Sequence, residues 1–361
     1  MDVNICPECG VPEPFNQGQV WLNNGDIVQG VNHEARLGFI ECENLDPLFR
    51  KIEEIIGISI EGLVVNITAR GVERYMSNYI PEAIKEMILT KQIELQTFTG
   101  AILDYCHILG YGKYELLDFR YEKDADDYSI LRIDAPFSVP EAAGSIAGVT
   151  SALVGSENAV SYKKVSPGLY EFVTRRSEYP DVLKEKMKPT PYRRRDGDIE
   201  LERCATCGVP KALSGFSWHL DRGLIVNKLT GRRMAILGPE LLDVLFKALE
   251  EELGETIPTV VVEAQRRFVK TGFYSMDEIS NEGDFRTQLA LRGMGNLREI
   301  TIGSHGIHLR IDNAAGYLLT VGMVQSIFEI AFNIDSIVAW ELSEEGDLEV
   351  DVKPQAVIET V

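Results

Sequence analysis

Four of the six cysteines occur in two short motifs of the same form, CPECG from Cys6 and CATCG from Cys204. The CxxC spacing directs two thiolates at one ion, and the glycine after the second cysteine permits the left-handed backbone that such a turn requires. Each motif supplies only two ligands, whereas a tetrahedral site needs four. We therefore predict that both motifs converge on one ion, with the ligands Cys6, Cys9, Cys204 and Cys207.

Zinc is the ion favoured at such a site, where it would join the two parts of the chain. Iron bound as in rubredoxin is an alternative, because four thiolates alone do not discriminate zinc from iron. A redox role is less favoured, since neither motif opens a helix after a strand, where a thiolate would be stabilised. A cluster without metal is the remaining alternative. Cys42 and Cys106 have no cysteine counterpart and are interpreted as buried, inert thiols.

The two cysteine motifs each begin one copy of an internal repeat. Equivalent residues are separated by 198 positions at the cysteines and by 178 positions near the end of the match, so the first copy carries about 20 extra residues, mostly after Arg70. A period this long indicates a duplicated domain and not a solenoid. The matched segments are LDPLFRKIEEIIG from Leu45 with LDVLFKALEEELG from Leu242, GYG at Gly110 with GMG at Gly293, and LRID at Leu131 with LRID at Leu309.

Both copies show the same order of expected elements. Short strands follow the cysteine motif, then an amphipathic helix such as the one from Leu242 to its stop at Gly254, a second helix, alternating strands, a small-residue helix and closing strands. This order predicts an α+β fold in two tandem copies, each with an antiparallel sheet, helices and an N-terminal CxxC motif. The expected organisation is a first repeat over 1–175, a linker over 176–198 and a second repeat over 199–361.

Several polar residues recur in both copies. Arginines at equivalent positions are candidates for ligand binding, in particular Arg70 and Arg267 on the expected second helix, together with Arg36 and Arg233. They would meet an anionic group on an otherwise apolar ligand. Ion pairs within each domain are the simpler interpretation of the same recurrence.

The composition argues against several classes of function. A net charge of −20 disfavours nucleic-acid and membrane-surface binding, and the run Arg193–Arg195 is interpreted as a solvated part of the linker. Residues 1–10 lack the features of a signal peptide, and no run approaches the ~18 apolar residues of a membrane span, so we expect a cytoplasmic protein. No known catalytic motif is recognisable.

Both copies resemble the 4-vinyl reductase domain family, also labelled hydrocarbon-binding. The resemblance covers about 20–174 and 217–354 and rests on the GxG turn before a strand pair, the small-residue helix and the final strand with Trp340 and Glu341. It implies a ligand-binding or sensory module with an apolar pocket, in a fold similar to haem nitric-oxide-binding and vesicle-trafficking domains. Family members often carry a cysteine cluster near the C-terminal end of the domain, whereas no cysteine follows Cys207 here.

These observations predict a non-enzymatic ligand-binding or regulatory protein, with a small apolar or amphipathic anionic ligand and a zinc ion shared between the repeats. One alternative is an electron-transfer or reductase accessory protein with thiolate-bound iron. The other is an acidic scaffold that docks a partner enzyme.

Overall fold

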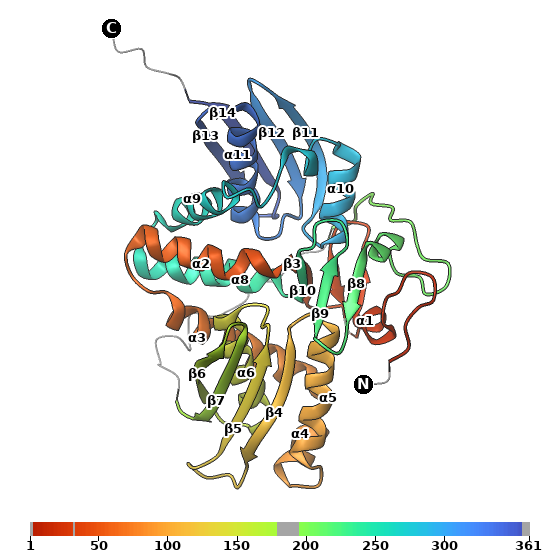
Figure 1. Ribbon diagram of the computed structural model, residues 1–361, viewed down its shortest axis with the longest axis vertical. Helices are drawn as coiled ribbons and strands as arrows, with labels where there is room; N and C mark the ends of the chain where they lie inside the picture. Colours follow the sequence, from red (N-terminus) through yellow and green to blue (C-terminus); the bar gives the residue numbers. More distant parts are fainter. Residues whose placement is uncertain (1–2, 32, 179–194, 356–361) are drawn as a thin grey trace.

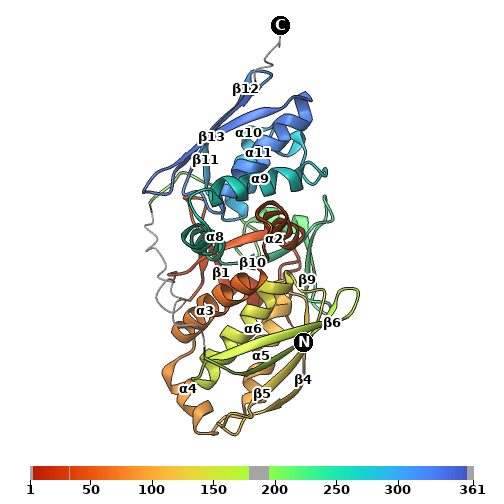
Figure 2. The same cartoon turned by 90° about the vertical axis from the view of Figure 1, so that its left-hand side faces the viewer.

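The computed structural model describes residues 3–31, 33–178 and 195–355 and contains three antiparallel sheets (Figure 1). Two sheets of four strands lie at opposite ends of the molecule, and a sheet of six strands lies between them. Helices pack between and beside the sheets (Figure 2). The expected α+β class is confirmed, because strands pair antiparallel throughout and the same order of elements occurs in both halves.

The elements of the first half are α1 (Glu13–Gly18), β1 (Gln19–Trp21), β2 (Ile27–Gln29), β3 (Arg36–Glu41), α2 (Cys42–Ile56), α3 (Glu61–Tyr79), α4 (Glu82–Leu89), α5 (Leu95–Ile108), β4 (Lys113–Arg120), β5 (Tyr128–Asp134), α6 (Val139–Val154), β6 (Asn158–Ser166) and β7 (Leu169–Arg176). The extra residues of this copy form α4 and lengthen the region of α5.

The elements of the second half are the 3-10 helix η1 (Lys211–Gly215), β8 (Phe216–His219), β9 (Leu224–Asn227), β10 (Arg233–Leu237), α8 (Pro239–Leu253), α9 (Ile257–Val269), the 3-10 helix η2 (Met276–Glu278), α10 (Glu282–Leu291), β11 (Asn296–Gly303), β12 (Gly306–Asp312), α11 (Tyr317–Phe332), β13 (Ser336–Leu342) and β14 (Leu348–Pro354). No helix in the described ranges has the length and apolar character that crossing a membrane requires.

The two outer sheets share one topology. Their strand orders are β4-β5-β7-β6 and β11-β12-β14-β13. In each half the small-residue helix lies close to the second helix, because a glycine removes the side chain at the crossing point. A Cβ on Gly144 of α6 would meet Val65 O at 2.5 Å, and one on Gly322 of α11 would meet Val262 O at 2.5 Å. This close approach explains why the two helices need small residues.

The central sheet joins the two halves. Its order is β1-β2-β3-β10-β9-β8, so three strands come from each half, and β3 pairs with β10 at the centre. The register there pairs Gly38 with Leu237 and Ile40 with Ala235, which relates the halves by an approximate twofold axis. The first helix of each half packs across this axis, with α2 on α9 and α8 on α3. The halves are therefore interlocked, with α2 and α8 between the two outer sheets (Figure 2).

The glycine turns before β4 and β11 also cross between the halves. Gly112 N donates to Gly223 O at 2.9 Å, and Gly295 N donates to Gly25 O at 3.2 Å. The GYG and GMG turns thus dock on the opposite half's N-terminal hairpin.

Most of the expected linker, including Arg193 and Arg194, lies outside the described residues. Arg195 is described, and its guanidinium forms ion pairs with Glu345, at 2.8 Å, and with Asp347. The side chain of Arg195 is partly exposed, and its charge is balanced by the loop before β14.

Candidate functional site

Each cysteine motif forms a tight turn held by the backbone. Gly10 N donates to Cys6 O at 2.9 Å and Cys6 N donates to Val11 O at 3.0 Å. The second motif repeats this pattern, with Gly208 N to Cys204 O at 2.9 Å. Gly10 and Gly208 have φ of 77° and 78°, the left-handed region that favours glycine. The sequence spacing therefore produces two equivalent thiol-bearing turns.

The two turns face each other, and their four thiols form one cluster. Cys6 Sγ lies 3.7 Å from Cys204 Sγ, and Cys9 Sγ lies 3.4 Å from Cys207 Sγ. All four sulfur atoms lie within 4.8 Å of one another. Zinc–sulfur bonds of about 2.3 Å in a tetrahedron place the sulfurs about 3.8 Å apart. The cluster can therefore hold a single metal ion with little movement.

The cluster lies in an apolar layer that packs on the central sheet. Cys9 and Cys204 are 4% and 2% exposed. Glu8 of the first motif and Thr206 of the second occupy equivalent positions and contact each other across the approximate twofold axis. Glu8 accepts hydrogen bonds from Thr206 N, at 3.0 Å, and from Thr206 Oγ1, at 2.7 Å. The surrounding buried side chains are Val11, Phe15, Trp21, Phe39, Val209, Leu213 and Phe216. These side chains cover most of the site, although Cys207 is only partly buried, and such burial is typical of structural metal sites.

The thiols differ in their electrostatic environment. The backbone N–H of Cys9 lowers the pKa of Cys6 to about 7, whereas burial raises the pKa of Cys9 and of Cys207. A bound cation would reverse the effect of burial, because coordination deprotonates a thiol outright.

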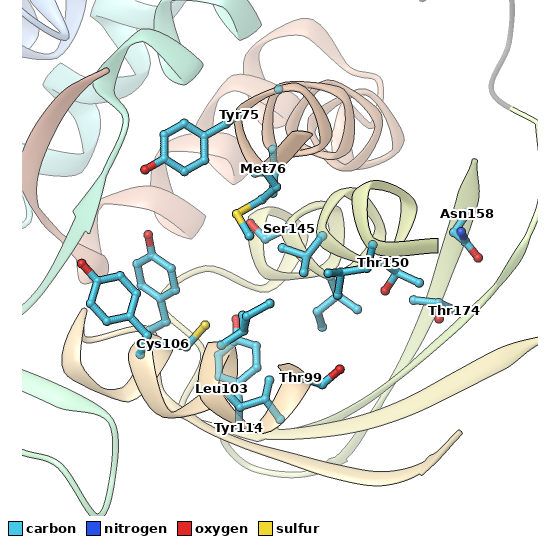
Figure 3. Close-up of a pocket in the computed structure, with 18 of the residues that line it drawn as sticks. Tyr75, Met76, Thr99, Leu103, Cys106, Tyr114, Ser145, Thr150, Asn158 and Thr174 are labelled. Atoms are coloured by element: carbon cyan, nitrogen blue, oxygen red, sulfur yellow. The ribbon is translucent and has the colours of Figure 1, made fainter. Parts of the chain in front are cut away.

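A second feature, which the sequence did not locate, is a cavity of about 1140 Å³ in the first half. It lies between α3 and α6 on one side and α5 and the strands β4 and β5 on the other, and β10 and α8 of the second half complete its wall. Figure 3 shows Tyr75 and Met76 of α3 facing Leu103 and Cys106 of α5 across this space. The volume is sufficient for a drug-sized organic molecule.

The cavity wall is mainly apolar and aromatic in surface, and it also includes hydroxyl, amide and charged side chains. Ser145 and Thr150 face it from α6, and Asn158 and Thr174 lie toward the end formed by β6 and β7 (Figure 3). Cys106, expected to be inert, is on the wall, and burial raises the pKa of its thiol to about 12. A neutral thiol at this position adds apolar surface.

Larger side chains occupy the corresponding region of the second half. The two LRID segments are 178 positions apart, and at the same spacing Thr150 of α6 corresponds to Phe328 of α11. Phe328 is fully buried. Met76 of α3 corresponds to Phe273 at the spacing of 197 that relates the second helices, and Phe273 packs on Phe268 with ring centroids 4.7 Å apart. At these two positions the first half has Thr150 and Met76 in place of the rings, and it also has the added α4.

The predicted arginines Arg36 and Arg233 lie at the junction of the halves. Arg36 forms a buried ion pair with Asp26 at 2.7 Å and donates to Asn313 O at 2.5 Å. Arg233 donates to Ala135 O at 2.6 Å. Each guanidinium thus bonds the loop before the small-residue helix of the other half, and Arg36 is among the residues that line the cavity.

The arginines of the second helices have different surroundings. Arg70 lines the cavity and forms ion pairs with Glu157 at 3.3 Å and Glu73 at 3.6 Å. Arg267 pairs with Glu263 at 2.6 Å on the surface of α9 and is not among the cavity residues. The structure therefore brings only Arg36 and Arg70 of the four to the cavity, and carboxylates balance both charges.

One site residue missed by the sequence reasoning is Glu141 of α6, which lines the cavity and is 3% exposed. Burial, and the charge of Asp46 to a smaller extent, raise its pKa to about 8. At the spacing of 178, Glu141 corresponds to Leu319. This exchange of a charged for an apolar residue within an apolar helix was the signal available in the sequence.

A second group of potential ligands, His308, Glu349 and Asp351, lies on the surface of β12 and β14. His308 Nδ1 is 3.2 Å from Asp351 Oδ1, a contact that an ordinary cross-strand pair explains.

Comparison with known families finds none that matches the sequence, and no curated protein matches it. Among solved structures, the chain is similar to the phenol-responsive sensory domain of the transcription activator PoxR, with 15% identity over 42% of this chain and 80% of that one and a TM-score of 0.30. It is also similar to a mutant H-NOX from T. tengcongensis, with 14% identity over 34% of this chain and 76% of that one and a TM-score of 0.23. Similarity at these scores assigns neither a family nor a function.

Proposed function

We propose that this chain is a non-enzymatic ligand-binding or regulatory protein, in which the cavity of the first half binds one small, largely apolar molecule. A single zinc ion shared by Cys6, Cys9, Cys204 and Cys207 holds the two halves together.

The cavity is the observation that supports ligand binding. Its volume of about 1140 Å³ exceeds what packing defects leave in a domain, and its wall is mainly apolar surface with polar and charged groups among it, as in small-molecule sites. The other half fills the corresponding region with buried aromatic side chains such as Phe328. A buried aromatic ring thus fits the equivalent helix position, and its replacement by Thr150 beside the cavity favours a function for the open space.

The position of the cavity supports a regulatory role. Ile236 and Leu237 of β10 and Leu241 of α8 contribute to its wall from the second half. A ligand in the cavity would contact both halves and would stabilise their interlocked arrangement, because a ligand that binds only the folded state stabilises it by mass action.

The thiol cluster supports a structural zinc ion. Sulfur–sulfur distances of 3.4 and 3.7 Å match the edges of a tetrahedral four-thiolate site. Zinc would supply no chemistry beyond coordination here, since the four thiols leave no open position for water or substrate. Iron at the same ligands would give colour and reversible reduction, which distinguishes the electron-transfer alternative.

Ligand binding is tested by titrating the full chain with N-phenylnaphthylamine, a neutral probe that fluoresces in apolar surroundings. Saturable binding of one probe per chain is expected. A chain that takes up no probe, or binds it without saturation, would overturn the proposal.

A further inference from the structure

The carboxyl group of Glu141 is the unusual polar feature of the cavity. It belongs to the first turn of α6, and its residue is 3% exposed. Its backbone N–H is used by the N-cap Ser138 Oγ at 3.4 Å, but Oε2 of the side chain is buried and has no hydrogen-bond partner among the described residues. A buried polar atom without a partner is destabilising, because it has lost its hydrogen bonds to water.

Among the described residues, no cation acts on this carboxyl group to lower its pKa. The nearest acid, Asp46 of α2, accepts from Val139 N at 3.3 Å and adds negative charge. The other titratable groups that act on the same region are Tyr111, whose hydroxyl already donates to Ile236 O at 2.6 Å, and the buried thiol of Cys42. The carboxyl group of Glu141 is therefore available to form a hydrogen bond with a ligand that enters the cavity.

The fold itself does not require an acid at this position. Glu141 corresponds to Leu319 in α11, and the two helices pack in the same way, through Gly144 and Gly322. Leucine would fill this place without the cost of burying a carboxyl group. The acid is thus specific to the half that has the cavity.

We propose that Glu141 is the polar anchor of the cavity and selects a hydrophobic molecule whose one polar group donates a hydrogen bond, a hydroxyl or an amine. This inference rests on the proposed ligand-binding function. An anionic ligand is disfavoured when Glu141 is ionised, because its carboxylate would repel a second negative charge, and Arg70 is already paired with Glu73 and Glu157.

The test is competition against N-phenylnaphthylamine by four ligands of one shape: naphthol, naphthylmethylamine, naphthoate and methylnaphthalene. In the wild type we expect naphthol or naphthylmethylamine to bind about tenfold more tightly than methylnaphthalene, the usual gain from one hydrogen bond to a charged or acidic group. The tighter of the two identifies the donor as hydroxyl or ammonium. Above about pH 8, where Glu141 is ionised, naphthoate should bind most weakly.

Two variants separate anchoring from folding. Glu141→Leu, which introduces the residue of the second half, should retain the probe and lose the preference over methylnaphthalene. Glu141→Gln retains a hydrogen-bonding amide and should keep a preference for naphthol but not for the amine. Glu115→Leu removes an exposed carboxylate outside the cavity and should behave as the wild type.

The outcomes distinguish this inference from the function on which it rests. A wild-type chain that does not bind the probe contradicts the ligand-binding function itself. Binding of the probe with naphthoate preferred, with equal affinity for all four ligands, or with a preference that persists in Glu141→Leu overturns only the role of Glu141.

Discussion

Cys6 Sγ and Cys204 Sγ lie 3.7 Å apart although the two residues are separated by 198 positions. The contact exists because the N-terminal turns of both halves meet at the approximate twofold axis. The four thiols can therefore bind one metal ion together, and not one ion at each motif.

Replacing Cys204 by serine should therefore remove the metal completely and not by half. We expect zinc to fall from one ion per chain to near zero and the thermal unfolding temperature to drop, because metal-binding free energy, about 10–16 kcal/mol in small zinc peptides, is folding free energy. Elemental analysis and calorimetry measure both. Cys42→Ser, at a buried thiol outside the cluster, is the control and should keep its zinc. An unchanged zinc content in Cys204→Ser would refute the shared site.

Arg36→Met should destabilise the junction of the halves by about 3–5 kcal/mol, because it removes the cation that offsets the buried Asp26 carboxylate. The double variant with Asp26→Asn should recover part of the loss, since no uncompensated charge remains. Urea unfolding of both variants measures these differences. Arg267→Met removes an exposed ion pair and should cost less than about 1 kcal/mol. Equal losses for Arg36→Met and Arg267→Met would contradict the role of Arg36.

Thr150→Phe places in the first half the residue that the second half has at this position, Phe328. The ring should occupy part of the cavity, so that affinity for N-phenylnaphthylamine falls more than tenfold while the unfolding temperature is maintained. Thr97→Phe, on the exposed side of α5 and outside the cavity wall, is the matched control. Unchanged probe binding by Thr150→Phe would place the probe elsewhere.

Phe328→Ala should cost about 3–5 kcal/mol, the usual effect of removing a fully buried ring. Thr150→Ala, which changes a residue at the edge of existing space, should cost much less. Chemical denaturation of the two variants compares them directly, and similar costs would show that the halves do not differ in packing as described.

Stability should fall as pH rises through the titration of Glu141. Burial raises its pKa to about 8 in the folded state, whereas an unfolded glutamate titrates near about 4.3. Between about pH 4.3 and pH 8 the unfolded chain has released the proton of Glu141, whereas the folded chain retains it. The stability that this proton contributes is therefore complete below about pH 4.3 and is lost as the pH rises toward about 8. The slope reaches about 1.4 kcal/mol per pH unit.

Glu141→Gln should remove that slope, and Glu82→Gln, at an exposed position, should keep it. Unfolding free energies at several pH values test this. Wild-type and Glu141→Gln curves that run parallel would show that Glu141 does not titrate as described.

Sequence reasoning predicted the α+β class and the meeting of the four cysteines, because both follow from local patterns repeated twice. The recurrence of Arg36 and Arg233 was also visible, but not their partners. Those partners, Asn313 O and Ala135 O, lie in the opposite half, and no pattern along one copy indicates an exchange of contacts between copies.

The cavity could not be predicted because empty space is a property of packing. It depends on where α4 and α5 lie relative to α3, and on which copy fills the space with rings. The extra residues after Arg70 and the exchange of Thr150 for Phe328 were visible in the sequence. Only the structure shows that these sequence differences lie beside a cavity.

The most direct test of the proposed function is native mass spectrometry of the untagged chain, as purified and after addition of N-phenylnaphthylamine. The expected masses correspond to one chain with one zinc ion and one organic molecule, either copurified or the added probe. A chain that carries no metal and takes up no organic molecule would contradict both the shared zinc site and the ligand cavity.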